Sequence, residues 1–217
     1  MTIELVNGDC LQYMVTLEDN SFDLAVVDPP YGLNMAKSFS QNGSNGCKNW
    51  GQYPHKDWDN NVPNQQYFDE LMRVSKNQII WGGNYFIDKI KISSQGWIVW
   101  NKGQRNFTLA DGELAWTSFD KAMRIFDMAR GQALFENRKT GGMFHPTKKP
   151  VGLYQWIFDK YAKKGMKILD THLGSGSSAI AAHDSGLDFV GIELDADYFQ
   201  AAKERLETHQ QQLRLFT

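Results

Sequence analysis

An apolar run that stops at two consecutive prolines places the strongest constraint on this chain. Residues 22–27 read Phe-Asp-Leu-Ala-Val-Val, and Asp28-Pro29-Pro30-Tyr31 follows directly. Proline has no backbone N–H and a fixed φ, so the pair can neither continue a strand nor enter a helix interior. The pattern predicts a buried strand that ends abruptly in a carboxylate, a rigid turn and an aromatic ring. In open α/β sheets, ligands bind at that end of the strands.

The turn carries groups that suit an amino ligand. The Asp28 carboxylate and the free carbonyl of Pro29 can accept two hydrogen bonds, and an exocyclic amino group donates two. Tyr31 can stack on the ring that bears the amino group. The alternative is a surface turn that merely caps a strand, which is the favoured interpretation of an Asp-Pro-Pro sequence taken alone.

The rest of the chain alternates short apolar runs with segments of helical periodicity. Strands are expected at 3–6, 78–81, 97–100, 113–118, 166–169 and 188–192, and helices at 9–17, 67–76, 151–163, 179–184 and from 195 onward. This alternation predicts a single α/β domain over residues 1–217, built on a doubly wound, mostly parallel sheet. Residues 34–64 are expected to form a long loop. Residues 120–147 show no clear periodicity, and 120–143 are interpreted as a small insert.

Composition and charge narrow the function classes. The two cysteines, Cys10 and Cys47, form no Cys-x-x-Cys pair, so neither a disulfide framework nor a metal site is expected, and a reducing cytoplasm fits. No apolar run approaches the ~20 residues of a membrane span, and no secretion signal is visible. The net charge of −2 is unevenly distributed: residues 1–36 carry −6, residues 121–167 carry +8 and residues 168–217 carry −5. The basic middle segment is either a phosphate-contacting surface or a solvated basic face.

A second motif lies near the C-terminus. Residues 168–170 read Ile-Leu-Asp, and a glycine loop with Gly174 and Gly176 leads into a helical segment. Glu193 ends the next strand, 17 residues after Gly176, where an acid can bind ribose hydroxyls. The pattern fits a dinucleotide site as well as an adenosine site, although no lysine follows the glycines as in a phosphate-binding P-loop. The acidic ends of the chain favour the sulfonium cation of S-adenosylmethionine over a pyrophosphate.

Together these residues resemble the DNA amino-methyltransferases, which methylate adenine N6 or cytosine N4. The Asp-Pro-Pro-Tyr motif precedes the glycine loop by about 140 residues. That order is similar to the β group of these enzymes, a circularly permuted Rossmann-like methyltransferase fold. Residues 7–10, 145–150 and 190–193 also match family segments. This chain departs from the family at Thr171-His172, where Pro-Phe is usual, and at Ser177, where Thr is usual.

The resemblance implies a role for each motif. The catalytic residues would be Asp28, Pro29, Pro30 and Tyr31, acting on a base flipped out of the duplex. S-adenosylmethionine would contact Asp9, Cys10, Asp28, His145, Thr147, Lys149, Asp170, His172, Leu173, Gly174, Ser175, Gly176, Ser177, Glu193 and Leu194. Candidate DNA phosphate contacts, selected for their charge, are Lys102, Arg105, Arg124, Arg130, Arg138 and Lys139.

The leading hypothesis is a site-specific methyltransferase that modifies adenine N6 in double-stranded DNA. Cytosine N4 is the first alternative, and the family more often carries Ser in place of Asp28 in that class. More distant alternatives are an RNA or protein methyltransferase, a noncatalytic DNA-binding protein of the same fold and an NAD-dependent dehydrogenase. A cytoplasmic, DNA-associated location is expected, and the resemblance leaves a homodimer and a cognate restriction enzyme open as partners.

Overall fold

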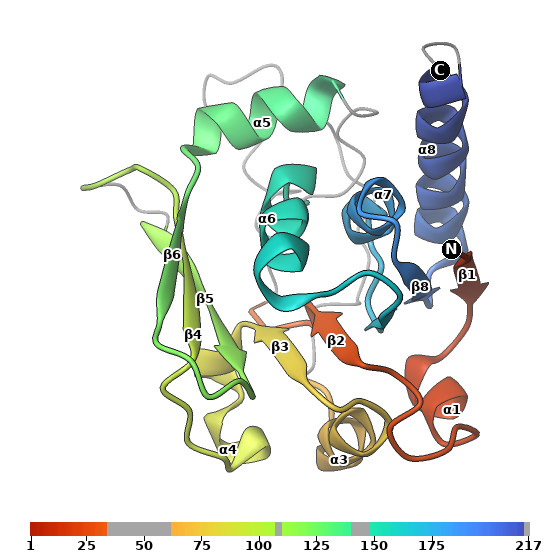
Figure 1. The fold of residues 1–217 in the computed structure, drawn as a ribbon. Helices are drawn as coiled ribbons and strands as arrows, with labels where there is room; N and C mark the ends of the chain where they lie inside the picture. Colours follow the sequence, from red (N-terminus) through yellow and green to blue (C-terminus); the bar gives the residue numbers. More distant parts are fainter. Residues whose placement is uncertain (34–61, 107–109, 140–147, 215–217) are drawn as a thin grey trace.

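The computed structural model describes residues 1–33, 62–106, 110–139 and 148–214 (Figure 1). Its strands are β1 (Ile3–Asn7), β2 (Leu24–Val27), β3 (Gln78–Trp81), β4 (Trp97–Asn101), β5 (Gly112–Thr117), β6 (Arg124–Asp127), β7 (Lys167–Asp170) and β8 (Asp188–Glu193). Its helices are α1 (Cys10–Met14), α3 (Gln65–Val74), the 3-10 turn η1 (Gly83–Tyr85), α4 (Ile87–Ile90), α5 (Arg130–Lys139), α6 (Val151–Tyr161), α7 (Ser177–Asp184) and α8 (Ala196–Arg214).

The eight strands form one sheet in the order β1-β8-β7-β2-β3-β5-β4-β6. All neighbouring pairs are parallel except those made by β5, which runs antiparallel to both β3 and β4. The mostly parallel, doubly wound sheet predicted from the sequence is therefore confirmed. The late strand β7 lies beside the early strand β2, as the permuted chain order requires.

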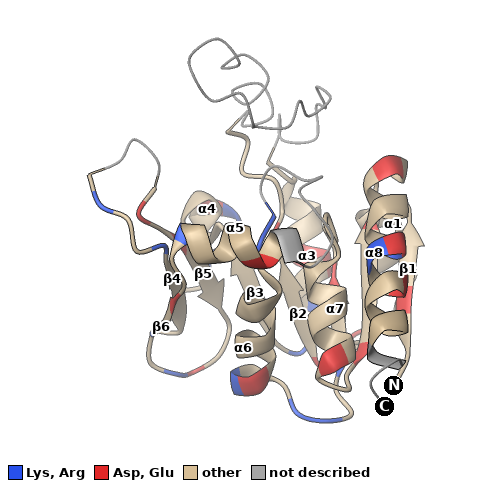
Figure 2. Cartoon of the chain, turned by 90° about the horizontal axis from the view of Figure 1, so that it is seen from above, with Lys and Arg blue, Asp and Glu red and all other residues tan. Residues whose placement is uncertain are grey.

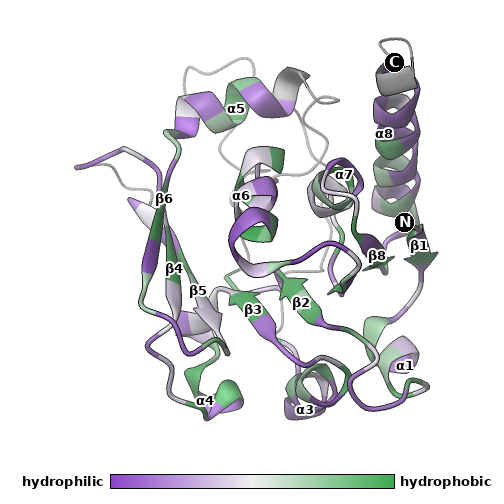
Figure 3. Ribbon diagram, viewed as in Figure 1, coloured by the Kyte–Doolittle hydropathy of each residue, from purple (hydrophilic) through white to green (hydrophobic). Residues whose placement is uncertain are grey.

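Helices cover both faces of the sheet (Figure 1). Leu24 and Val26 of β2 face a core shared with α6, α7 and α8, whereas Ala25 and Val27 face the core under α1, α3 and α4. Successive residues of a strand point to opposite faces, so a strand buried on both faces reads as a continuous apolar run. Figure 3 shows this as green along β2 and β3.

Connections after β7 and β2 wind in opposite directions across the sheet. The chain passes from β7 through α7 to β8, and from β2 through α3 to β3, so the strand order reverses between β7 and β2. Such a switch point leaves a crevice beyond the carboxyl ends of the strands, where ligands bind. Asp28 follows β2 at this point, and Asp170 ends β7 there.

Three predicted helix starts have polar caps. Asp9 accepts hydrogen bonds from the backbone of α1, Asn64 caps α3, and Asp195 accepts from the backbone N–H groups of Asp197 and Tyr198 at the start of α8. Each side chain satisfies N–H groups that have no partner within the helix. The predicted N-cap role of Asp195 is confirmed.

Residues 120–147 show no clear periodicity in the sequence, yet the part that the structure describes contains regular elements. Strand β6 pairs in parallel with β4 at the sheet edge, and α5 follows it. Strand β6 is short and largely exposed, so it shows neither a buried apolar run nor alternation. The turn η1 and the short helix α4 were also missed, because three or four residues are too few to show periodicity.

Much of the predicted long loop, residues 34–61, lies outside the described residues. Among the helices that the structure describes, none has the length and apolar character needed to span a membrane.

Candidate active site

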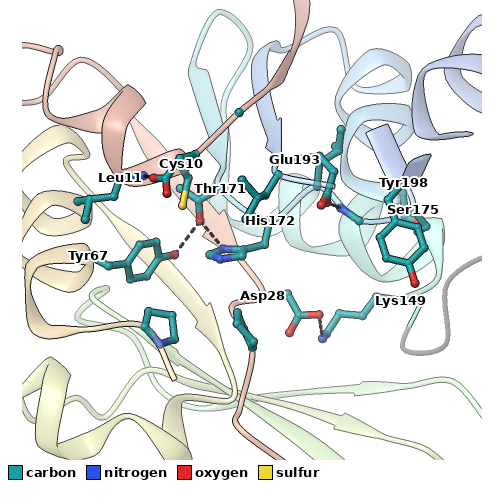
Figure 4. Close-up of a pocket in the computed structure, with 18 of the residues that line it drawn as sticks. Cys10, Leu11, Asp28, Tyr67, Lys149, Thr171, His172, Ser175, Glu193 and Tyr198 are labelled. Carbon is teal, nitrogen blue, oxygen red and sulfur yellow. Dashed lines mark hydrogen bonds and ion pairs between the residues drawn. The ribbon is translucent and has the colours of Figure 1, made fainter. Parts of the chain in front are cut away.

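A cavity of about 300 Å³ opens where the carboxyl ends of β1, β8, β7 and β2 meet (Figure 4). This volume falls at the lower end of the range of roughly 300–1,000 Å³ for small-molecule sites. The cavity is lined by Gly8, Asp9, Cys10, Leu11, Asp28, Pro30, Pro63, Asn64, Tyr67, Lys148, Lys149, Tyr154, Thr171, His172, Leu173, Gly174, Ser175, Ser177, Glu193, Leu194 and Tyr198. Both sequence motifs therefore border one cavity, although about 140 residues separate them.

Glu193 organises one end of this cavity. Its Oε2 accepts a hydrogen bond of 2.8 Å from the Gly174 N–H, and its Oε1 accepts one of 3.0 Å from Asp195. Burial raises the pKa of the Glu193 carboxyl above its ordinary value, and these backbone donors oppose the rise. Each carboxylate oxygen has a further lone pair, so Glu193 can still accept hydroxyl groups from a ligand.

Helix α8 packs against the glycine loop and hydrogen-bonds to it. Arg205 is buried, and it donates hydrogen bonds to the Ser175 carbonyl at 2.6 Å and to the Ser177 hydroxyl at 3.0 Å. Gly176 has φ +74°, and an added Cβ would lie 3.2 Å from the Ala202 side chain. The loop conformation thus needs a glycine with positive φ packed closely on α8.

Asp170 lies beneath the loop and does not line the cavity. Its Oδ1 accepts from the His172 N–H at 3.0 Å, and its Oδ2 accepts from the Ser178 hydroxyl at 2.6 Å. Burial raises the pKa of Asp170 to about 7, with further contributions from the nearby charges of Asp28 and Glu193. Asp170 therefore fixes the strand-to-loop turn through backbone and hydroxyl contacts.

His172 occupies the position of the family's usual aromatic residue. Its ring lies edge-on to Tyr67 at 5.4 Å between centroids, and its Nδ1 is 2.9 Å from the Thr171 hydroxyl (Figure 4). Burial lowers the pKa of His172 to about 4, so the ring is uncharged at neutral pH. An uncharged, buried imidazole can pack against a ligand as a phenyl ring does.

The Asp28 carboxylate is held by two side chains. The Tyr31 hydroxyl donates to its Oδ1 at 2.6 Å, and Lys149 donates to its Oδ2. The Tyr31 ring stacks on Tyr85 with centroids 5.1 Å apart. A Cβ at Gly82, which has φ +71°, would collide with the Tyr31 ring. The rigid turn after β2 therefore presents a carboxylate whose position is fixed by the end of β3.

Lys149 also forms an ion pair with a second carboxylate, that of Glu113. Its Nζ lies 3.3 Å from Glu113 Oε2, and Lys102 binds the other oxygen of Glu113. Glu113 is the second residue of β5, whose reversed direction brings it to the carboxyl ends of the parallel strands. Two cations and two carboxylates thus alternate from the surface to Asp28.

The structure brings most of the predicted cofactor residues to the cavity, but not all of the candidates. Pro29, Tyr31, Asp170 and Gly176 lie behind its lining, and Lys149 faces Asp28 and Glu113. His145 and Thr147 lie outside the described residues. Cys10 lines the cavity as a partly buried thiol, and desolvation raises its pKa to about 12.

The candidate DNA contacts do not all lie at the same ends of the strands. Lys102 and Arg105 follow β4, and the Arg130 N–H bonds to the Lys102 carbonyl, so these three lie near one another at the carboxyl end of β4. Figure 2 shows Lys and Arg on the β4–β5 loop and at the start of α5. Arg124 instead begins β6 and pairs with Ile98 near the start of β4, so it lies at the amino ends of these parallel strands. Arg138 and Lys139 lie in the last turn of α5.

Several lining residues were not predicted as site residues. Tyr67 reaches the cavity from α3 and shares a hydrogen bond of 2.7 Å with Thr171, and Tyr154 reaches it from α6. Both tyrosines occupy apolar positions of helical periodicity, so the sequence pattern indicates only burial. The sequence did not mark Glu113 as a site residue either, because it stands at the start of the strand expected at 113–118 and not after the end of a strand.

Comparisons with known proteins agree with this geometry. A family model described as DNA methylase matches residues 99–204. The type II methyltransferase M2.MboI of Moraxella bovis is 25% identical over 236 residues, covering 93% of this chain and 86% of that protein.

Two solved structures share the fold. The crystal structure of the M1.HpyAVI–SAM complex has a TM-score of 0.59 and 20% identity, covering 94% of this chain and all of that one. The cytosine-N4-specific PvuII DNA methyltransferase has a TM-score of 0.59 and 13% identity, covering 97% of this chain and 91% of that one.

The sheet order and the cavity at its switch point define an α/β protein with the fold of the DNA methyltransferases. Over residues 99–204 the chain matches the DNA methylase family model, and in this match and in its relatives it is similar to the DNA amino-methyltransferases, the enzymes that methylate adenine N6 or cytosine N4. The resemblance found in its motifs is thereby confirmed, and the comparisons leave both target bases open.

Proposed function

We propose that this chain transfers a methyl group from S-adenosylmethionine to adenine N6 of a base flipped out of double-stranded DNA. The observation that carries the proposal is the position of Asp28, which borders the same cavity as Glu193 and the glycine loop. The cavity combines an adenosine-type site with an acceptor for amino hydrogens. Asp28 rather than Ser supports adenine over cytosine N4, which is the second candidate.

The residues around the cavity fit S-adenosylmethionine. Asp9, Asp28 and Glu193 line it, and this excess of carboxylates suits a sulfonium cation. Glu193 would accept the ribose hydroxyls beside the Gly174 backbone. Lys148 also lines the cavity, and burial lowers its pKa to about 7. A cofactor carboxylate beside Lys148 would favour its protonated form and a salt bridge.

Asp28 and the Pro29 carbonyl would accept the two hydrogens of the target amino group. These bonds draw electron density toward the nitrogen lone pair and hold the lone pair in line with the methyl group. S-adenosylmethionine supplies that methyl group and leaves as a neutral thioether. The nitrogen is positively charged once the N–C bond has formed, and its surplus proton passes to Asp28 and then to water. Cys10, with its raised pKa, takes no part as a nucleophile.

DNA would lie over the edge formed by Lys102, Arg105 and Arg130, where three basic residues border the site. Residues 120–143 are proposed to carry target recognition, with β6 serving also as a sheet strand. A homodimer, a cognate restriction enzyme and a cytoplasmic location remain predictions.

The direct test is incubation of genomic DNA with labelled donor, followed by modified-base analysis. Label on adenine N6 supports the proposal, label on cytosine N4 selects the second candidate, and no label contradicts both. Asp28→Ala should reduce transfer about a hundredfold or more while the Kd for S-adenosylmethionine stays within about threefold. Glu193→Ala should instead raise that Kd, and an unchanged value would contradict its ribose role.

A further inference from the structure

Lys149 is a buried cation placed between two carboxylates. Its side chain is 4% exposed, and its Nζ contacts Asp28 Oδ2 and lies 3.3 Å from Glu113 Oε2. It also donates to the Tyr31 hydroxyl at 3.3 Å. An ammonium group has three N–H donors, so every donor of Lys149 has an acceptor in this cluster.

Glu113 and Lys149 stabilise each other in their charged forms. Burial alone would raise the pKa of Glu113, but Lys149 and Lys102 outweigh it and hold that pKa below its ordinary value. Burial alone would lower the pKa of Lys149, but Asp28 and Glu113 outweigh it and raise that pKa. A full positive charge therefore lies against the carboxylate that the proposed reaction uses.

This arrangement conflicts with the transfer step. Asp28 must accept hydrogen bonds from the target amino group while the amino nitrogen becomes positively charged. An ammonium on the same carboxylate competes for the acceptor and repels that charge. Glu113 offers the ammonium a second position nearby, and a move to it keeps Lys149 paired without exposing either charge to an apolar environment.

We propose that Lys149 is a positioning residue that stands in for the target amino group. Its ammonium binds Asp28 while the pocket holds no base, and it shifts to Glu113 when the base enters. The inference rests on the proposed function and adds to it a role for Glu113. It explains why two carboxylates face one lysine. The partly buried Asp28 would keep the Tyr31 hydroxyl but lose its cationic partner without Lys149, and the flexible four-carbon stem of lysine allows the shift.

The first test compares Glu113→Gln with the double variant Glu113→Gln/Lys149→Met. Glutamine removes the charge that receives Lys149, so the ammonium stays on Asp28. The kcat/KM for DNA should fall at least tenfold, while the Kd for S-adenosylmethionine stays within threefold. The double variant should recover activity at least fivefold over Glu113→Gln, because the blocking cation is gone. A merely structural network predicts the opposite order, with the double variant the least active.

The second test leaves Glu113 intact, in case its variant fails to fold. Lys149→Arg keeps the charge, but a guanidinium can bridge both carboxylates at once and cannot vacate Asp28. It should have a lower kcat than Lys149→Met, whereas a structural salt bridge would make the arginine variant the better enzyme. Lys160→Met on α6, an exposed lysine remote from Asp28, is the matched control, and thermal melting verifies folding.

Loss of the proposed function and loss of the role of Lys149 give different experimental results. A wild-type protein that methylates no base in genomic DNA removes the proposed function and this inference with it. A wild-type protein that methylates DNA, with the double variant no better than Glu113→Gln and Lys149→Arg above Lys149→Met, removes only the role of Lys149.

Discussion

Replacing Asp170 with Asn should change how the stability of this protein depends on pH. The carboxyl is 1% exposed, and burial raises its pKa from an ordinary 3.8 to about 7. The folded state therefore binds a proton on Asp170 more tightly than the unfolded state does. Its stabilising effect is fully present below the unfolded pKa and is lost as pH rises through 7. A shift of about 3 pH units corresponds to about 4 kcal/mol at most.

Urea unfolding of wild type and Asp170→Asn between pH 5 and 8 tests this reasoning. Asparagine cannot ionise, so the variant should gain about 3 kcal/mol relative to wild type across that range, in addition to any constant offset from changed hydrogen bonds. Asp159→Asn, at an exposed position of α6, is the control. Its free energy of unfolding relative to wild type should change by less than about 0.5 kcal/mol between pH 5 and 8. A difference between Asp170→Asn and wild type that does not vary with pH would refute the raised pKa of Asp170.

Three further substitutions probe the contacts that hold the site. Gly82→Ala would force the Tyr31 ring away and strain a positive φ, so we expect a loss of about 1–3 kcal/mol in urea unfolding and at least tenfold slower methyl transfer. Arg205→Met leaves the buried Ser175 carbonyl without its donor, and should cost about 1–3 kcal/mol and weaken S-adenosylmethionine binding in calorimetry. His172→Phe should leave that Kd within about threefold between pH 6 and 8, because the imidazole is already uncharged there.

The sequence predicts the sheet well because its central strands are buried on both faces. Such strands are apolar along most of their length, as at 24–27 and 79–81, and Asp28-Pro29 follows the first whereas Gly82 follows the second. Strand β6 has no such constraint, since it lies at the edge and is mostly exposed. Its place in the sheet is set by pairing with β4, which no local pattern records.

The cofactor side of the site was also predictable, because its geometry is local. A glycine loop between a strand and a helix specifies its own shape, and Glu193 lies at the end of the adjacent strand. The amino-acid spacing within one βαβ unit therefore brings Glu193 and Gly174 into contact. Tyr67 and Tyr154 could not be found in this way, because whether an apolar helical position borders a cavity depends on what packs opposite it.

The placement of Glu113 follows from strand direction. In a parallel sheet, functional side chains come from the residues that follow each strand, which is where sequence analysis looks for them. Strand β5 runs antiparallel to its neighbours, so its first residues lie at the same edge as the last residues of β3 and β4. Glu113 therefore reaches the Lys149–Asp28 pair from the start of a strand and not from its end. An acid at the second position of this reversed strand therefore lies beside the Lys149–Asp28 pair, and the charge on Lys149 has two carboxylates as alternative partners.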